Sequence, residues 1–352
     1  MIAAKSTRKG TALIGLAAVL LMATAARSAE RAPLERGRTI PMPGVEGRID
    51  HMAVDGDGHR LFVAALGNNT LEVLDLQLGR RLHTITGLRE PQGVAYLPKS
   101  QRIVVANGGD GSCRFFESTH YQPAGRIDLK DGADNLRYDQ RDQRIYVGFG
   151  QGALAGIEPA KLTRVSEIVL PGHPESFQLE SRGSRIFVNV PGSRQIAVLD
   201  RRQDAVVARW PMEEFQGNFP MALDETHQRL LIGCRKPARL VVLDAQSGKV
   251  VASLPCAGDT DDVYYDARLL RVYVSGGEGT VSVIQQSDAD HYSLLATVPA
   301  AAGARTSLFV PASGRLYVAV PHRGQQLAEI WEYRSPVTEP TAAELAPAAI
   351  RN

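Results

Sequence analysis

The sequence predicts an all-β fold built from seven copies of one motif, and three observations support this prediction. An Arg followed by three apolar residues recurs at intervals of 42, 42, 41, 44, 42 and 44 residues, a period typical of propeller blades and some helical repeats. Each copy contains four short runs rich in Val, Ile, Leu and Tyr, bounded by turn residues, which are typical of strands. No copy has the i, i+3, i+4 apolar spacing of a helix. The sequence therefore predicts a seven-bladed β-propeller with four-stranded blades. The seven arginines are Arg60, Arg102, Arg144, Arg185, Arg229, Arg271 and Arg315.

The copies repeat the same strands in order. The clearest spans residues 132–150, where a polar turn ends at Arg144 and Ile-Tyr-Val follows. In the fifth copy we expect strands at 219–223, 229–233, 239–243 and 249–254, with a hairpin turn at 244–248. The second strand of every copy is apolar at consecutive positions, so both of its faces must be covered, as happens when sheets stack radially.

The two ends of the repeat array predict how the ring closes. The seventh copy has strands at 315–319 and 328–333 but no fourth strand before Ser335-Pro336. Residues 37–44 resemble the fourth strands of other copies, so we expect this N-terminal segment to complete the last blade and cover its open edge. The predicted propeller is 36–334, followed by a flexible C-terminal tail at 335–352.

The N-terminus has the pattern of an export signal. Lys5, Arg8 and Lys9 precede an apolar run at 12–22 and small residues at 23–28, which predicts a signal peptide over 1–28. The apolar run is shorter than the roughly 18 residues that a membrane anchor needs, so no membrane span is expected after cleavage. The mature protein is predicted to be periplasmic or secreted.

Charge and cysteine content narrow the partners and the covalent links. The formal net charge of +2 becomes −2 when Lys5, Arg8, Lys9 and Arg27 are removed, so nucleic acid is not an expected partner. An oxidising compartment permits one disulfide, and Cys234 with Cys256 is the pair within a single repeat. The strands that carry these two cysteines should be separated by one other strand, which puts the sulfur atoms too far apart for a disulfide unless a loop bends. The sequence leaves both a disulfide and two free thiols open.

Three copies carry closely similar strings: Arg-Ile-Tyr-Val at 144–147, Arg-Val-Tyr-Val at 271–274 and Arg-Leu-Tyr-Val at 315–318. With the period near 42, they resemble the secreted bacterial YVTN-repeat β-propellers over about residues 37–334. The resemblance implies a propeller fold and an extracytoplasmic location. It also implies a role as a binding module or as a subunit beside a redox enzyme.

Counting back from the seven arginines places two positions of every copy near the propeller axis, where the first strands begin. The first position is Asp50, Gln92, Asp134, Glu175, Phe219, Asp261 and Arg305; the second is His51, Gly93, Asn135, Ser176, Pro220, Asp262 and Thr306. His173 and Asn218 lie just before these positions. Carboxylates gathered around one axis repel each other unless a cation, a proton or an Arg offsets them.

This register yields a candidate metal site and two candidate bases. Asp50, Asp134, Asn135, Glu175 and Asp261 supply hard oxygen donors suited to Ca²⁺ or Mg²⁺. The alternative is that these residues cap strands and line a water-filled channel. His51 and His173 have the intrinsic pKa of a general base, or are hydrogen-bonded polar residues of the channel.

Basic residues are expected on the same face. Arg235 and Lys236 in one loop, His322 and Arg323 in another, and Arg305 would bind an anionic ligand or an acidic partner, or else form a solvated rim. The residues expected to bind a ligand are thus Asp50, His51, Gln92, Asp134, Asn135, His173, Glu175, Asn218, Arg235, Lys236, Asp261, Asp262, Arg305, His322 and Arg323.

Two functions are consistent with this pattern. The first is an extracytoplasmic binding or scaffold protein that recognises a small-molecule ligand or a periplasmic protein partner on its axial face. The alternative is a divalent-metal-dependent hydrolase, lactonase or lyase, with the ion at the mouth of the central channel and His51 or His173 moving a proton.

Overall fold

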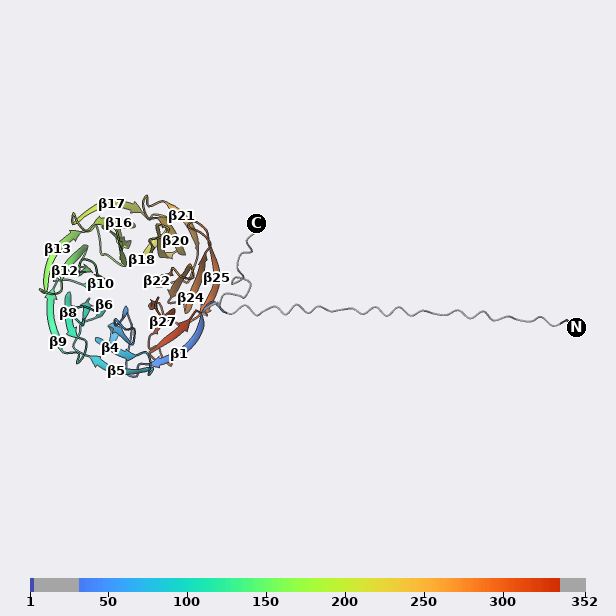
Figure 1. Ribbon diagram of the computed structural model, residues 1–352, viewed down its shortest axis with the longest axis horizontal. Coiled ribbons are helices and arrows are strands. Elements are labelled where there is room, and N and C mark those ends of the chain that lie inside the picture. Colours follow the sequence, from blue (N-terminus) through green and yellow to red (C-terminus); the bar gives the residue numbers. More distant parts are fainter. Residues whose placement is uncertain (3–31, 336–352) are drawn as a thin grey trace, which may run out of the picture. The chain divides into compact units, whose positions relative to one another are not determined.

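The computed structural model describes residues 1–2 and 32–335, and 32–335 form an all-β ring of seven four-stranded sheets, as predicted (Figure 1). Its helices are two short 3-10 turns, η1 (Leu66–Asn68) and η2 (Pro191–Ser193). Among these described residues, no helix has the length and hydropathy needed to cross a membrane.

Each sheet is one blade, with its first strand nearest the axis and its last strand at the rim (Figure 1). The first strands are β2 (Met52–Val54), β6 (Pro91–Leu97), β10 (Ala133–Asp139), β14 (Phe177–Leu179), β18 (Gln216–Asp224), β22 (Thr260–Asp266) and β26 (Ser307–Val310). The second strands are β3 (Arg60–Ala65), β7 (Arg102–Asn107), β11 (Arg144–Phe149), β15 (Arg185–Val190), β19 (Arg229–Lys236), β23 (Arg271–Gly276) and β27 (Arg315–Val320). The third strands are β4 (Thr70–Asp75), β8 (Ser112–Glu117), β12 (Ala153–Glu158), β16 (Gln195–Asp200), β20 (Ala238–Asp244), β24 (Thr280–Gln286) and β28 (Glu329–Arg334). The rim strands are β5 (Arg80–Ile85), β9 (Pro123–Asp128), β13 (Thr163–Val169), β17 (Ala205–Pro211), β21 (Val250–Pro255), β25 (Tyr292–Pro299) and β1 (Glu35–Pro41).

All seven repeat arginines begin a second strand, which explains why they mark the period. The apolar residues after each Arg are buried at consecutive positions. Phe62 of β3 and Ile103 of β7, for example, belong to one apolar cluster that joins two neighbouring blades. The prediction that these strands are covered on both faces is confirmed.

The N-terminal strand closes the ring, as predicted. β1 pairs antiparallel with β28, and Ile40 lies opposite Ile330 in a shared core. Arg271 of the neighbouring blade donates hydrogen bonds to the Pro33 carbonyl at 3.3 Å and to the Ser335 hydroxyl at 2.9 Å. A single side chain therefore ties both ends of the ring together.

The two predicted terminal segments lie mostly outside the part of the chain that the structure describes. Residues 3–28 of the predicted signal peptide and 336–352 of the predicted tail lie outside the described residues.

Cys113, Cys234 and Cys256 are all free, so the pairing of Cys234 with Cys256 is not formed. Strand β20 separates the strand of Cys234 from the strand that Cys256 follows. Burial raises the pKa of both thiols to about 12, so neither is a nucleophile near neutral pH.

Candidate functional site

A narrow pocket opens where the first strands begin, and we call it the axial mouth. Its volume is about 20 Å³, room for little more than one water molecule or ion. The residues that line it are Arg48, Asp50, His51, Asp134, Asn135, Glu175, Ser176, Phe219 and Asp261. Six of these were predicted as ligand-binding residues from the repeat register, so side chains far apart in sequence meet as expected.

Bulges explain how two consecutive residues of a strand reach the axial mouth. The pairing register shifts between Ala133 and Leu136 at the start of β10, and the same shift occurs at the start of β6, β18 and β22. A bulge re-aims side chains that would otherwise alternate between the two faces of a sheet. Asp134 and Asn135 consequently line the same pocket.

Three potential metal ligands converge beside the axial mouth. One ligand atom from each of Asp134, His173 and Glu175 lies within 4.8 Å of the other two. His173 is fixed through both ring nitrogens, with Nδ1 2.6 Å from the Gly150 carbonyl and Nε2 3.2 Å from Asp134 Oδ2. These bonds raise the pKa of His173 to about 9, mainly through the Asp134 carboxylate. The group spans blades three and four.

Burial is the main reason that the pKa of Glu175 is raised to about 7, and the nearby Asp134 carboxylate adds to it. Among the described residues, the Glu175 carboxylate has no hydrogen-bond or ion-pair partner. A half-buried carboxylate without a partner either keeps its proton or gains a cation. The residues present therefore fit a bound cation, which would displace the proton on Nε2 of His173.

The metal set differs from the predicted set of five oxygen donors. Asp50 is paired with Arg48 at 2.6 Å, and Asp261 is paired with Arg235. These two carboxylates do not belong to the convergent group, whereas His173 does, and the Asn135 amide donates to Asp134 Oδ1 at 3.4 Å beside that group. The sequence did not show these pairings because Arg48 lies outside the register that was counted. One imidazole and two carboxylates suit Zn²⁺ or Mn²⁺ better than Ca²⁺ or Mg²⁺.

His51 lies at the floor of the axial mouth between two carboxylates. Its Nε2 is 3.6 Å from Asp50 Oδ1, and its Nδ1 is 3.8 Å from Asp262 Oδ1. Burial lowers the pKa of His51, but the two carboxylates outweigh burial and the net shift is upward. Asp262 accepts a hydrogen bond from the Ser307 amide, and burial raises its pKa to about 7. Both distances are longer than a hydrogen bond, so His51 interacts with the two carboxylates through charge.

The predicted basic residues do not form one anion site. Arg235 is bound to Asp261 and the Thr260 carbonyl and lies over the Phe219 ring, and Arg305 is paired with Asp259 at 2.8 Å. The other predicted members are placed as follows: His322 is 2.7 Å from a Glu46 oxygen, while Lys236 and Arg323 are exposed. Nearby carboxylates offset the charges of Arg235, Arg305 and His322, and solvent surrounds the other two side chains.

Two further predicted residues lie away from the axial mouth. Asn218 is fully buried and donates to Asn189 Oδ1 at 2.9 Å and to the Gln195 carbonyl at 3.2 Å, so it joins blades four and five. Gln92 packs against Gly108 of its own blade. Asn218 therefore stabilises the contact between two blades, and Gln92 packs within its own blade. Neither residue lines the axial mouth.

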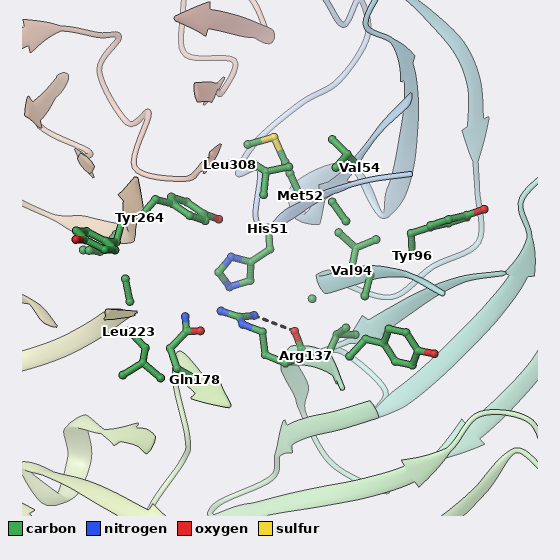
Figure 2. A pocket seen from close by; sticks show the side chains of 18 residues that line it. His51, Met52, Val54, Val94, Tyr96, Arg137, Gln178, Leu223, Tyr264 and Leu308 are labelled. Atoms are coloured by element: carbon green, nitrogen blue, oxygen red, sulfur yellow. Dashed lines mark hydrogen bonds between the residues drawn. The ribbon is translucent and has the colours of Figure 1, made fainter. Parts of the chain in front are cut away.

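A larger space, which we call the axial cavity, continues along the first strands beyond His51 (Figure 2). Its volume is about 420 Å³. Its walls include one register position from every blade, namely Ala53, Ala95, Arg137, Gln178, Ala222, Tyr264 and Leu308. Each of these lies three residues beyond the first predicted axial position, so the same counting from the seven arginines would have found them.

These features define the class of protein: a seven-bladed β-propeller with an acidic axial mouth. No known sequence family matches the chain, and no curated protein matches it. Among solved structures, the chain is similar to a chain of Kuenenia stuttgartiensis hydrazine synthase, with TM-score 0.70, 16% identity and coverage of 79% of this chain and 95% of the other. It is also similar to a chain of the mitotic checkpoint complex, with TM-score 0.72, 12% identity and coverage of 91% and 98%. The WD40 repeats of RRP9 give TM-score 0.73, 12% identity and coverage of 86% and 97%. At these identities the similarity establishes the fold.

Proposed function

We propose that this protein is an extracytoplasmic binding protein of the YVTN-repeat type, which recognises its guest at the axial mouth. We further propose that a divalent cation held by Asp134, His173 and Glu175 is part of that site. The observation that carries the proposal is the convergence of three ligand atoms within 4.8 Å, one of them on an unpartnered, half-buried carboxylate. A cation there would present open coordination positions to an oxygen of a small molecule or of a partner protein.

The fold supports a binding role. A rigid ring of blades presents loops and inner strand ends on one face, which is the arrangement that binding proteins use. Two of the similar structures are a WD40-repeat domain and a chain from a multi-protein complex, and they support a protein partner by analogy of fold alone.

Metal binding is tested by isothermal titration calorimetry and thermal unfolding of chelator-treated protein with MnCl₂, ZnCl₂, CaCl₂ and MgCl₂. We expect one equivalent of Mn²⁺ or Zn²⁺ to bind and to raise the melting temperature. Glu175→Gln should remove the rise, whereas the exposed Glu214→Gln should retain it. Equal melting shifts in both variants, or no shift in the wild type, would refute the cation site.

Metal-dependent hydrolase, lactonase or lyase chemistry is a second candidate, and the position of His51 favours it. A half-buried imidazole between Asp50 and Asp262, next to the proposed cation, is placed to take a proton from a bound water molecule or substrate. The test is turnover of a lactone and ester panel by Mn²⁺- or Zn²⁺-loaded protein. His51→Gln should lower kcat and leave the metal affinity unchanged; absence of turnover across the panel would reject this candidate.

The extracytoplasmic location rests on the charged, apolar and small-residue segments of residues 1–28. Expression in a bacterial host, followed by fractionation and N-terminal sequencing, tests it directly. We expect a mature chain that begins near residue 29 in the periplasmic or medium fraction. An intact N-terminus in the cytoplasmic fraction would contradict the proposal.

A further inference from the structure

The axial cavity differs from the axial mouth in its lining and its charge. Just over half of its surface is apolar, and Met52, Val54, Val94, Leu223 and Leu308 lie around the space shown in Figure 2. Ala53, Ala95 and Ala222 lie in one layer of the ring, and their short side chains leave the space open. The other four blades place longer side chains at that position. A volume of about 420 Å³ falls within the range of small-molecule pockets.

Arg137 is the charged group of this layer, and its guanidinium is incompletely satisfied. Nη1 donates to the Leu136 carbonyl at 2.8 Å and to Asn135 Oδ1 at 3.4 Å, and Nη2 donates to the Ser176 hydroxyl at 3.3 Å. An arginine has five N–H groups, so Nε–H and one Nη2–H lack an acceptor among the described residues. None of the ion pairs within 32–335 involves Arg137, whose guanidinium carbon lies 5.5 Å from the centre of the Phe177 ring, although carboxylates surround the axial mouth above it.

A neutral donor lies beside this guanidinium. Gln178 donates one amide N–H to the Met221 carbonyl at 2.7 Å and keeps a second. Figure 2 shows the side chains of His51, Arg137 and Gln178 pointing toward one another inside the axial cavity. The Tyr264 hydroxyl donates to the Ser307 carbonyl at 3.0 Å, so its ring acts as a wall and its hydroxyl does not serve as a donor.

We propose that the axial cavity binds a small monocarboxylate with an apolar body, with its carboxylate held by Arg137 and Gln178. The two free N–H groups of the guanidinium match the two oxygens of a carboxylate. The apolar body lies against Leu223, Leu308 and Val54, away from the axial mouth. A dianion such as a phosphate monoester is disfavoured, because the acidic residues of the axial mouth lie only three residues up the same strands.

The probe is octanoate, with octan-1-ol as the uncharged match, measured by isothermal titration calorimetry. We expect the wild type to bind one octanoate, and Arg137→Met to weaken that binding by about 10- to 100-fold, the effect of losing a charged hydrogen-bond partner. Octan-1-ol binding should be the same in both proteins. The exposed Arg202→Met is the matched control and should bind octanoate as the wild type does.

Arg137→Lys keeps the charge and loses the planar fork, so it should give an intermediate affinity and replaces Arg137→Met if that variant does not fold. In metal-free protein, Glu175→Gln should bind octanoate as the wild type does, and in a separate metal titration it should lose the cation, which separates this proposal from that of the axial mouth. The proposal is overturned if the wild type binds no octanoate, if octan-1-ol binds it equally well, or if Arg137→Met leaves the octanoate affinity unchanged.

Discussion

Replacing Glu175 by Gln should change the pH dependence of stability in a direction fixed by the structure. The pKa of Glu175 is raised from 4.5 to about 7, mainly by burial. Below pH 4.5 the carboxyl is protonated in both the folded and unfolded chains. Between pH 4.5 and 7 the unfolded chain releases its proton first, so the folded chain binds more protons and loses stability as the pH rises. Glutamine has no such proton to lose.

The full shift corresponds to about 3 kcal/mol. The His173 imidazolium and solvent offset part of it, so we expect Glu175→Gln to gain about 1–3 kcal/mol relative to the wild type at pH 8, and close to nothing at pH 4.5. Urea unfolding of metal-free protein between pH 4.5 and 8 measures the difference. The exposed Glu214→Gln should run parallel to the wild type at every pH. A constant difference between Glu175→Gln and the wild type across this range would refute the reasoning.

Two further predictions concern stability away from the axial mouth. Ile40→Ala in the closing strand should cost about 2–5 kcal/mol in urea unfolding, because Ile40 is fully buried, whereas Leu78→Ala, 63% exposed, should cost under about 0.5 kcal/mol; equal costs would contradict the closure. Asn218→Ala should lose about 1–3 kcal/mol by leaving the Asn189 side chain and the Gln195 carbonyl without their donor. Its Mn²⁺ affinity should equal that of the wild type, and a loss of Mn²⁺ binding would restore Asn218 to the ligand set.

The fold was predictable because the blade repeats its chemistry. Each second strand needs an unbroken apolar run, since neighbouring blades cover both of its faces, and the Arg before it marks where the strand begins. Ring closure was predictable for a related reason: a blade with three strands leaves an open edge, and residues 37–44 were the segment that resembled a fourth strand.

The sequence predicted which carboxylates lie at the axial mouth, but not which of them form ion pairs with arginines. Register arithmetic placed Asp50, Asp134 and Glu175 at one axial mouth. Which carboxylates keep a free charge depends on arginines that the counted register does not include, such as Arg48, which lies two residues before Asp50 in the same segment. His173 was identified as a neighbour of the register, but its place in the convergent group depends on its contact with the Gly150 carbonyl in the adjacent blade.

The axial mouth and axial cavity lie on the same strands, so their proposed occupants should influence each other. Three residues along a strand span about 10 Å, and unit charges at that distance interact by about 1–2 kcal/mol at an effective dielectric constant near 20. Burial raises the pKa of Asp262 and the neighbouring carboxylates raise that of His51, and the charge of Arg137 already opposes both increases. A carboxylate bound to Arg137 would cancel that positive charge and so favour a cation above it. Because binding linkage is reciprocal, a cation at Asp134, His173 and Glu175 would strengthen carboxylate binding by the same factor.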